Sequence, residues 1–115
     1  MDRNQDYQNI VDKAVFYICN NLKQNLKLKD IAKAVNLSPF HFHRVFMQIK
    51  GESPNSYMQK RRVELAEQMI RLNKNEYFHL IAEKCGFSSH ARFISAFKKY
   101  YGMTPFQYRK NLLNK

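Results

Sequence analysis

The sequence predicts an all-α protein of seven helices, arranged as two helix-turn-helix subdomains that a long connector helix joins. Three observations favour this fold class. The 115-residue chain is 44% hydrophobic and carries nine phenylalanines and seven tyrosines, which is enough for a modest core. It has only three glycines and three prolines, so long loops are not expected. The third observation is an internal repeat of about 50 residues.

Two stretches of the chain share one pattern of residue types, and such a repeat decides the architecture. The offset is 50 residues at Ile31 and 51 residues from Phe42 onward, so the second copy has one extra residue in its turn. Each copy has the pattern of helix, tight turn and helix. Equivalent positions, with the first copy named first, are Ile31 and Ile81, Asn36 and Gly86, Ser38 and Ser89, Phe42 and Phe93, Phe46 and Phe97, Gly51 and Gly102, Pro54 and Pro105, and Tyr57 and Tyr108.

Residues in the turns indicate where the helices end and begin. Asn36 and Gly86 belong to the two residue types that most readily accept positive φ, so we expect a left-handed residue to end the first helix of each copy. Ser38 and Ser89 are the expected N-caps of the second helices.

Glycine and proline mark the later boundaries. Gly51 and Gly102 are expected to end the second helices, and Ser53-Pro54 and Thr104-Pro105 to cap and open the helices that follow. Together with a helix ahead of the first copy, these signals predict seven helices over roughly residues 7–23, 28–35, 39–50, 54–72, 78–85, 90–101 and 105–113.

The fourth helix is the expected connector. Its apolar residues lie on one stripe at helical spacing, which lets the helix pack on both copies. These residues are Met58, Leu65, Met69 and Leu72. The predicted domain boundaries are 1–53 for the first helix and first helix-turn-helix, 54–72 for the connector, and 73–115 for the second helix-turn-helix.

Positive charge is concentrated in the repeats. The formal net charge is +11, and residues 1–26 carry three basic and three acidic side chains, residues 27–76 ten and five, and residues 77–115 seven and one. This distribution predicts a polyanionic partner. Duplex DNA accounts for both the charge and the repeat. A non-specific nucleic-acid binder or an anionic-membrane binder accounts for the charge but not for capped turns in register.

No apolar run has the length of a signal peptide or a membrane span, so we expect no membrane partner and a cytoplasmic, nucleoid-associated protein. Cys19 and Cys85 are expected to be small buried side chains rather than a disulfide.

His41 and His43 would point about 200° apart on a helix and cannot share one metal ion. No metal or cofactor is expected, and the absence of a nucleophile, carboxylate pair or phosphate loop predicts no enzyme.

The second helix of each copy has one core face and one exposed face. In the first copy the predicted core residues are Phe42, Val45, Phe46 and Ile49, and the predicted exposed residues are Phe40, His43, Arg44 and Met47. In the second copy the predicted core residues are Phe93, Ala96, Phe97 and Tyr100, and the predicted exposed residues are Ala91, Ile94, Ser95 and Lys98, flanked by His90 and Arg92. Because Ser95 stands where Arg44 does, specific hydrogen bonding should be weaker in the second copy.

Both helix-turn-helix copies end in the pattern Gly-x-Ser/Thr-Pro, which is typical of a known protein family. The specific runs are Gly86-Phe87-Ser88-Ser89 and Phe97-Lys98-Lys99-Tyr100-Tyr101-Gly102-Met103-Thr104-Pro105. This pattern resembles the DNA-binding domain of the AraC/XylS family of bacterial transcription regulators, over about Ile10 to Arg109. The length is similar to that of stand-alone members, while residues 37–46 also resemble regulators with a further ligand-binding domain. Both arrangements stay open.

The resemblance implies a sequence-specific regulator that inserts one helix of each copy into successive major grooves. Its base-reading candidates are Phe40, His43, Arg44, His90, Ala91, Arg92, Ile94 and Ser95. Its backbone-contact candidates are Ser38, Met47, Gln48, Lys60, Arg61, Ser89, Lys98 and Lys99. The run Lys60-Arg61-Arg62 is either such a phosphate clamp or a solvated face. Stand-alone members often have Trp, polar side chains or Arg where this chain has Phe40, Ala91, Ile94 and Ser95, so its operator should differ from theirs.

The implied partners are duplex operator DNA and RNA polymerase, with the module acting as a monomer. Two unlike copies in one chain need no palindrome, so we expect one protein on an asymmetric site of about two helical turns. A connector of about 28 Å is shorter than the roughly 34 Å between successive major grooves. The duplex is therefore expected to bend toward the protein.

Overall fold

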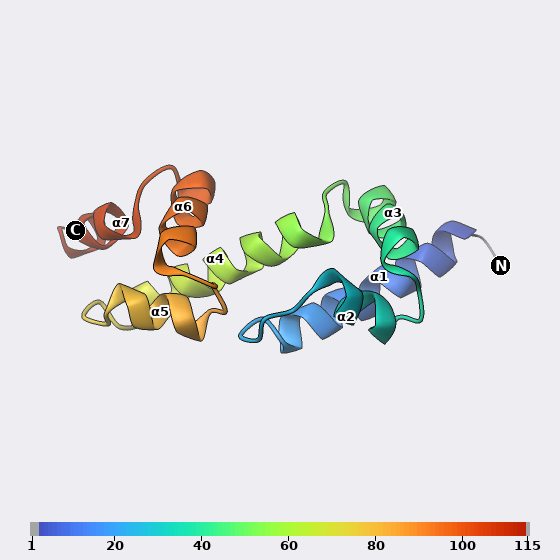
Figure 1. Cartoon of the computed structure of the whole chain (residues 1–115). Coiled ribbons are helices and arrows are strands. Elements are labelled where there is room, and N and C mark those ends of the chain that lie inside the picture. The colour runs from blue at the N-terminus through green and yellow to red at the C-terminus, as the bar shows by residue number, and fades with distance from the viewer. Residues whose placement is uncertain (1–2, 115) are drawn as a thin grey trace. The chain divides into compact units, whose positions relative to one another are not determined.

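A computed structural model describes residues 3–114 and contains seven helices and no strand in that range (Figure 1). The predicted all-α fold class is confirmed. The helices are α1 (Arg3–Asn20), α2 (Leu28–Ala34), α3 (Pro39–Lys50), α4 (Pro54–Leu72), α5 (Phe78–Lys84), α6 (His90–Tyr101) and α7 (Pro105–Leu113).

The chain divides into two compact units, which we call unit 1 (residues 1–58) and unit 2 (residues 59–115). In unit 1, α1, α2 and α3 pack against one another, and in unit 2, α6 packs against both α5 and α7 (Figure 1). The boundary falls inside α4. Met58 of α4 belongs to the core of unit 1, whereas Val63, Ala66 and Ile70 belong to the core of unit 2. The connector helix therefore supplies side chains to both cores.

Each core is built around a pair of phenylalanines one helical turn apart. In unit 1, Phe42 and Phe46 are fully buried with ring centroids 5.6 Å apart, and the ring of Tyr57 lies 5.6 Å from that of Phe46. In unit 2, Phe93 and Phe97 are fully buried with centroids 5.9 Å apart. Aromatic rings of this size dominate the burial of apolar surface in small domains.

The turns have the backbone conformations that the sequence predicts. Asn36 has φ 61° and Gly86 has φ 88°, so a left-handed residue follows the first helix of each helix-turn-helix. The second helices end at Gly51 and Gly102, each with φ 74°. Glycine adopts this conformation without the steric cost that a Cβ atom imposes. Asn36 is the only residue other than glycine with positive φ among residues 3–114.

The predicted N-caps are also present. Ser38 accepts a hydrogen bond from the backbone N–H of His41 at 3.2 Å, and Ser89 accepts one from Arg92 at 3.1 Å. At the start of α4, Ser53 accepts from the N–H of Ser56 at 3.0 Å. These bonds satisfy N–H groups that a helix cannot satisfy internally. They determine where the helices begin and hence which side chains face outward.

α1 differs from its predicted range at both ends, because it begins at Arg3 and stops at Asn20. It stops early where the side-chain amide of Asn21 donates to the carbonyl of Tyr17 at 2.8 Å, a local bond that competes with the helical pattern. The expectation that Cys19 is buried was wrong. Ile18 occupies the buried stripe, so Cys19, one residue later, is exposed. Cys85 is buried as predicted.

The predicted apolar stripe of α4 is correct only in part. Met58 is buried, and Leu65 and Met69 are half-buried against the core of unit 2. Leu72 is 86% exposed, because it is the last helical residue and lies beyond the buried stripe that ends at Ile70. That stripe, rather than the predicted one, supplies the fully buried residues of α4 in unit 2.

A buried carboxylate joins α7 to α4 inside unit 2. Glu67 is only 8% exposed, its Oε2 lies 2.7 Å from Nε of Arg71, and the Tyr108 hydroxyl donates to it. Burial, followed by the hydrogen bond to Glu67 and its negative charge, raises the pKa of Tyr108 to about 12. The Tyr108 hydroxyl therefore stays protonated and donating at neutral pH.

Replacing Phe46 with alanine should lower the free energy of unfolding by about 3–5 kcal/mol, because it removes a fully buried ring from unit 1. Phe40→Ala on the same helix is the matched control. Since Phe40 is 74% exposed, its loss should change stability by less than about 0.5 kcal/mol. Urea unfolding of both variants measures the difference, and equal losses would contradict the assignment of the two faces.

Candidate nucleic-acid interface

The outer face of α3 carries a basic and aromatic group of side chains. Phe40, His43, Arg44 and Met47 are all exposed, as predicted. The Arg44 guanidinium lies 5.9 Å from the centroid of the Phe40 ring, at the outer limit of a cation–π contact. A guanidinium held beside an apolar ring presents donors for a guanine edge and a surface for a thymine methyl group.

The exposed face of α6 is smaller than predicted. His90, Ala91, Arg92 and Ser95 are exposed. Ile94 was expected to be exposed, but it is half-buried and packs against the core of unit 2. The reason is that burying an aliphatic side chain against the neighbouring core residues lowers the free energy of the folded state. The face of α6 therefore offers fewer groups than that of α3.

The predicted backbone contacts fall into two groups. On α3 and α6 and at their caps, Gln48, Lys98 and Lys99, together with Ser38 and Ser89, are exposed. On α4, by contrast, Lys60 and Arg61 are half-buried and therefore less exposed than the first group. Arg61 also forms an ion pair with Glu64 at 2.9 Å. Burial lowers the pKa of the neighbouring Arg62 guanidinium. The two groups therefore differ in how freely they reach solvent.

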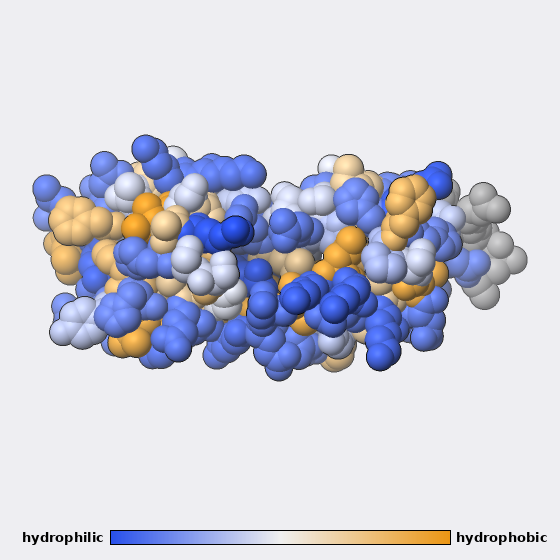
Figure 2. All heavy atoms as spheres, viewed as in Figure 1, coloured by the Kyte–Doolittle hydropathy of each residue, from blue (hydrophilic) through white to orange (hydrophobic). Residues whose placement is uncertain are grey.

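The charge balance of the two exposed faces favours a polyanion. Neither α3 nor α6 contains Asp or Glu, and the last turn of α6 carries Lys98 and Lys99. In unit 2, three carboxylates form ion pairs with basic side chains of the same chain. These pairs are Glu64 with Arg61, Glu67 with Arg71 and Glu76 with Lys84. Figure 2 shows the mainly hydrophilic character of one face of the molecule, with hydrophobic residues in separate patches.

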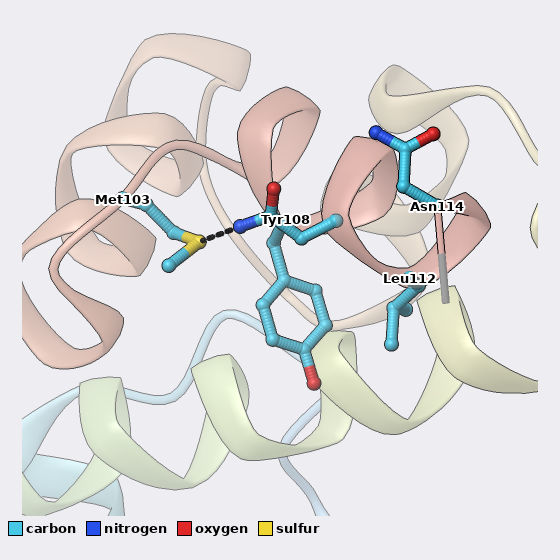
Figure 3. Close-up of a pocket in the computed structure, with 5 residues that line it drawn as sticks. Met103, Tyr108, Leu112 and Asn114 are labelled. Atoms are coloured by element: carbon cyan, nitrogen blue, oxygen red, sulfur yellow. Dashed lines mark hydrogen bonds between the residues drawn. The ribbon is translucent and has the colours of Figure 1, made fainter.

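A hollow of about 430 Å³ in unit 2 offers no reactive chemistry. It is lined by Met103, Tyr108, Asn111, Leu112 and Asn114 (Figure 3). The Tyr108 side chain points toward the connector helix, where its hydroxyl binds Glu67, and the Asn111 amide lies 3.5 Å from Sδ of Met103. Among residues 3–114, no cluster of three or more His, Cys, Asp or Glu is placed to hold a metal ion. The helices of this part of the chain are also too short or too polar to cross a membrane.

Comparison with known proteins identifies the architecture. A family described as a helix-turn-helix domain matches residues 31–111. A transcriptional regulator from Chromobacterium violaceum with an AraC-type DNA-binding domain superimposes with a TM-score of 0.81 at 29% identity, covering 90% of this chain and 91% of that one. This chain belongs to the AraC family of helix-turn-helix transcription regulators. It is thus a DNA-binding module of that family.

Other relatives support the same family assignment. The C-terminal domain of AraT, a response regulator from Geobacillus stearothermophilus, gives a TM-score of 0.82 at 35% identity, covering 89% of this chain and 84% of that one. The Tn10 TetD protein of Escherichia coli is 32% identical over 97% of this chain and 80% of its own length. The AraC-type module spans only 37% of LumQ of Photobacterium leiognathi, a probable transcriptional regulator that is 30% identical over 81% of this chain. Relatives of this family therefore differ in what accompanies the module.

The AraC-type module also contains polar residues near α3 that sequence reasoning missed. Lys27 and Asn55 line a second hollow together with His43. Lys27 precedes α2 and Asn55 lies in the first turn of α4, so neither belongs to the helix that the repeat singled out. The only sequence signal for them is their proximity to the expected helix starts at residues 28 and 54. That signal does not reveal that the three residues line one hollow.

Proposed function

We propose that this AraC-type module recognises an asymmetric duplex-DNA operator, with α3 and α6 entering successive major grooves. The observation that carries the proposal is the same in both units. A helix with a serine N-cap buries two phenylalanines and leaves its opposite face exposed and free of carboxylates. A helix of this kind fits the width of the B-DNA major groove.

α3 is the stronger base reader in this proposal. Arg44 can form a bidentate pair with guanine, and Phe40 can contact a thymine methyl group. On α6 the proposed readers are His90, Ala91, Arg92 and Ser95, with the half-buried Ile94 at the edge. Ser95 hydrogen-bonds less selectively than Arg44, so we expect the half-site of unit 2 to be less strictly specified.

The proposed backbone contacts position the two helices on the duplex. Lys98 and Lys99 at the end of α6 and the exposed polar residues of α3 supply phosphate contacts, which determine register without reading sequence. We also propose that Lys60 and Arg61 reach phosphates, although Arg61 would have to share its charge with Glu64.

Further proposals concern the context in which the module acts. We infer that this chain contributes DNA binding without catalysis. One relative, AdaA of Bacillus subtilis, is a bifunctional transcriptional activator and DNA repair enzyme, and the chain is 35% identical to it over 47% of its length. We propose that the module acts in the cytoplasm on nucleoid DNA, as a monomer, and contacts RNA polymerase at the promoter.

Binding to duplex DNA should weaken steeply as salt rises, because lysine and arginine displace counterions from phosphates. The slope of log affinity against log salt should be about −0.9 for each phosphate neutralised. Fluorescence anisotropy from about 50 to 200 mM salt measures it. A hairpin RNA and anionic vesicles serve as comparisons. Affinity independent of salt, or preference for vesicles or RNA over duplex DNA, would contradict the proposal.

The two reading helices should respond unequally to truncation. Arg44→Ala should cost about 1–3 kcal/mol of binding free energy and relax base preference in one half-site, whereas Ser95→Ala should cost little. Both side chains are exposed, so neither change should unfold the protein. Affinities for the operator and its point variants give the comparison, and equal losses would refute the ranking of the helices.

One protein should occupy one asymmetric site of about two helical turns. α4 is continuous over 19 residues, about 28 Å, which is less than the roughly 34 Å between successive major grooves. We therefore expect the duplex to bend toward the protein. Analytical ultracentrifugation gives the stoichiometry, and fluorescence transfer between the duplex ends gives the bend. Two proteins on a palindrome would rule out this arrangement.

A further inference from the structure

Unit 1 contains a hollow of about 420 Å³ beside α3, which we call the unit 1 pocket. The buried residues Leu26, Pro54 and Met58 form an apolar floor. The exposed residues Lys27, His43 and Asn55 form a polar rim. Leu28 and Ser53, both half-buried, complete the lining. The pocket therefore combines an apolar surface with two basic side chains and one amide.

The electrostatics of the rim favour an anion. Lys27 carries a positive charge, and the imidazole of His43 and the amide of Asn55 can each donate a hydrogen bond. The pocket also contains Ser53 and Pro54, at the N-terminus of the 19-residue α4, where the helix dipole favours negative charge. These four sources act in the same direction.

Two carboxylates lie in the same turns but do not line the pocket. Asp30 accepts a hydrogen bond from the backbone N–H of Lys27 at 3.1 Å, at the start of α2. Glu52 accepts one from the hydroxyl of Ser56 at 3.2 Å, at the start of α4. Both carboxylates are thus engaged with the helix starts rather than with the pocket.

The size of the pocket indicates more than a bare ion. One water molecule needs only about 10–15 Å³ of such space, so a single oxyanion would leave the apolar floor of the hollow uncovered. A deoxyribose joined to a phosphate has both required parts. Its C–H edges match the surface formed by Leu26, Pro54 and Met58, and its charged oxygens match the rim.

Unit 2 provides an internal comparison, because the repeat gives each pocket residue a counterpart. The rim residues Lys27, His43 and Asn55 correspond to Tyr77, Ile94 and Phe106. None of these counterparts carries a positive charge.

The floor of the equivalent place in unit 2 is also different. Leu28 and Met58 correspond to Phe78 and Arg109. The Arg109 guanidinium lies 3.9 Å from the centroid of the Phe78 ring and donates to the carbonyl of Glu76. The two unit 2 counterparts therefore contact each other. The basic rim and the apolar floor of unit 1 are therefore both replaced by other residue types in unit 2.

We propose that the unit 1 pocket binds one sugar-phosphate unit of the DNA strand that borders the major groove entered by α3. Lys27, His43 and Asn55 surround the phosphate, and the sugar lies on the apolar floor. The inference rests on the proposed function and deepens it, because it adds Lys27 and Asn55 to the interface and moves His43 from base reading to the backbone. Unit 1 is then the more firmly positioned half of the module.

Lys27→Gln in the full chain tests the charge at this site. It should reduce the slope of log affinity against log salt by about 0.9, the value for one phosphate contact. Between 50 and 200 mM salt this amounts to about a threefold smaller loss of affinity. Lys13→Gln is the matched control, because Lys13 is an exposed lysine on α1 that does not line the pocket. Its slope should stay close to that of the unmodified chain.

Duplexes with single neutral methylphosphonate linkages locate the contact. At one linkage beside the α3 half-site, the substitution should weaken binding of the unmodified chain but not of Lys27→Gln. Asn55→Phe, which places the unit 2 residue on the rim, should be equally insensitive at that linkage. If Lys27→Gln binds duplex DNA with the same salt slope as the unmodified chain, the proposed role of the pocket is wrong. The same holds if the effects of Lys27→Gln and of the methylphosphonate add up at every linkage. Either result would leave the proposed function intact. No duplex binding by the unmodified chain would overturn the proposed function as well.

Discussion

Burial of two phenylalanines on each of α3 and α6 holds each unit together. Each unit has fewer than 60 residues, so a fully buried pair such as Phe42 and Phe46 supplies much of its core. Once that face is buried, the opposite face of the helix must be exposed. The serine cap and the left-handed glycine then determine which residues that exposed face contains. Stability and DNA recognition thus depend on the same helices.

The repeat preserves the core but not the surface. Phe93 and Phe97 reproduce the buried pair, whereas Arg44 is replaced by Ser95 and His43 by Ile94. The pocket residues Leu28 and Met58 are replaced in unit 2 by Phe78 and Arg109, which contact each other. Under the proposed function, conserving the buried aromatic rings while changing the exposed groups would let one scaffold read two different half-sites. An asymmetric operator is the expected consequence of a duplicated fold with diverged surfaces.

Sequence reasoning succeeded where a local signal determines the structure. Asn36 and Gly86 predicted the turns because few residue types accept positive φ. It failed where neighbouring side chains decide. The stripe ending at Leu72 and the buried stripe containing Ile70 both fit a helical period, and only tertiary packing selects between them. Ile94 was misplaced for the same reason, and Lys27, His43 and Asn55 lie on three segments that no periodicity relates.

Selection of bound sequences from a random duplex library, using the full chain, would show how the module recognises DNA. We expect a single enriched site of about two helical turns, without internal symmetry and with one half more strictly specified than the other. The unequal halves follow from the different faces of α3 and α6. A palindromic consensus, two equally specified halves, or no enrichment over the starting library would contradict this expectation.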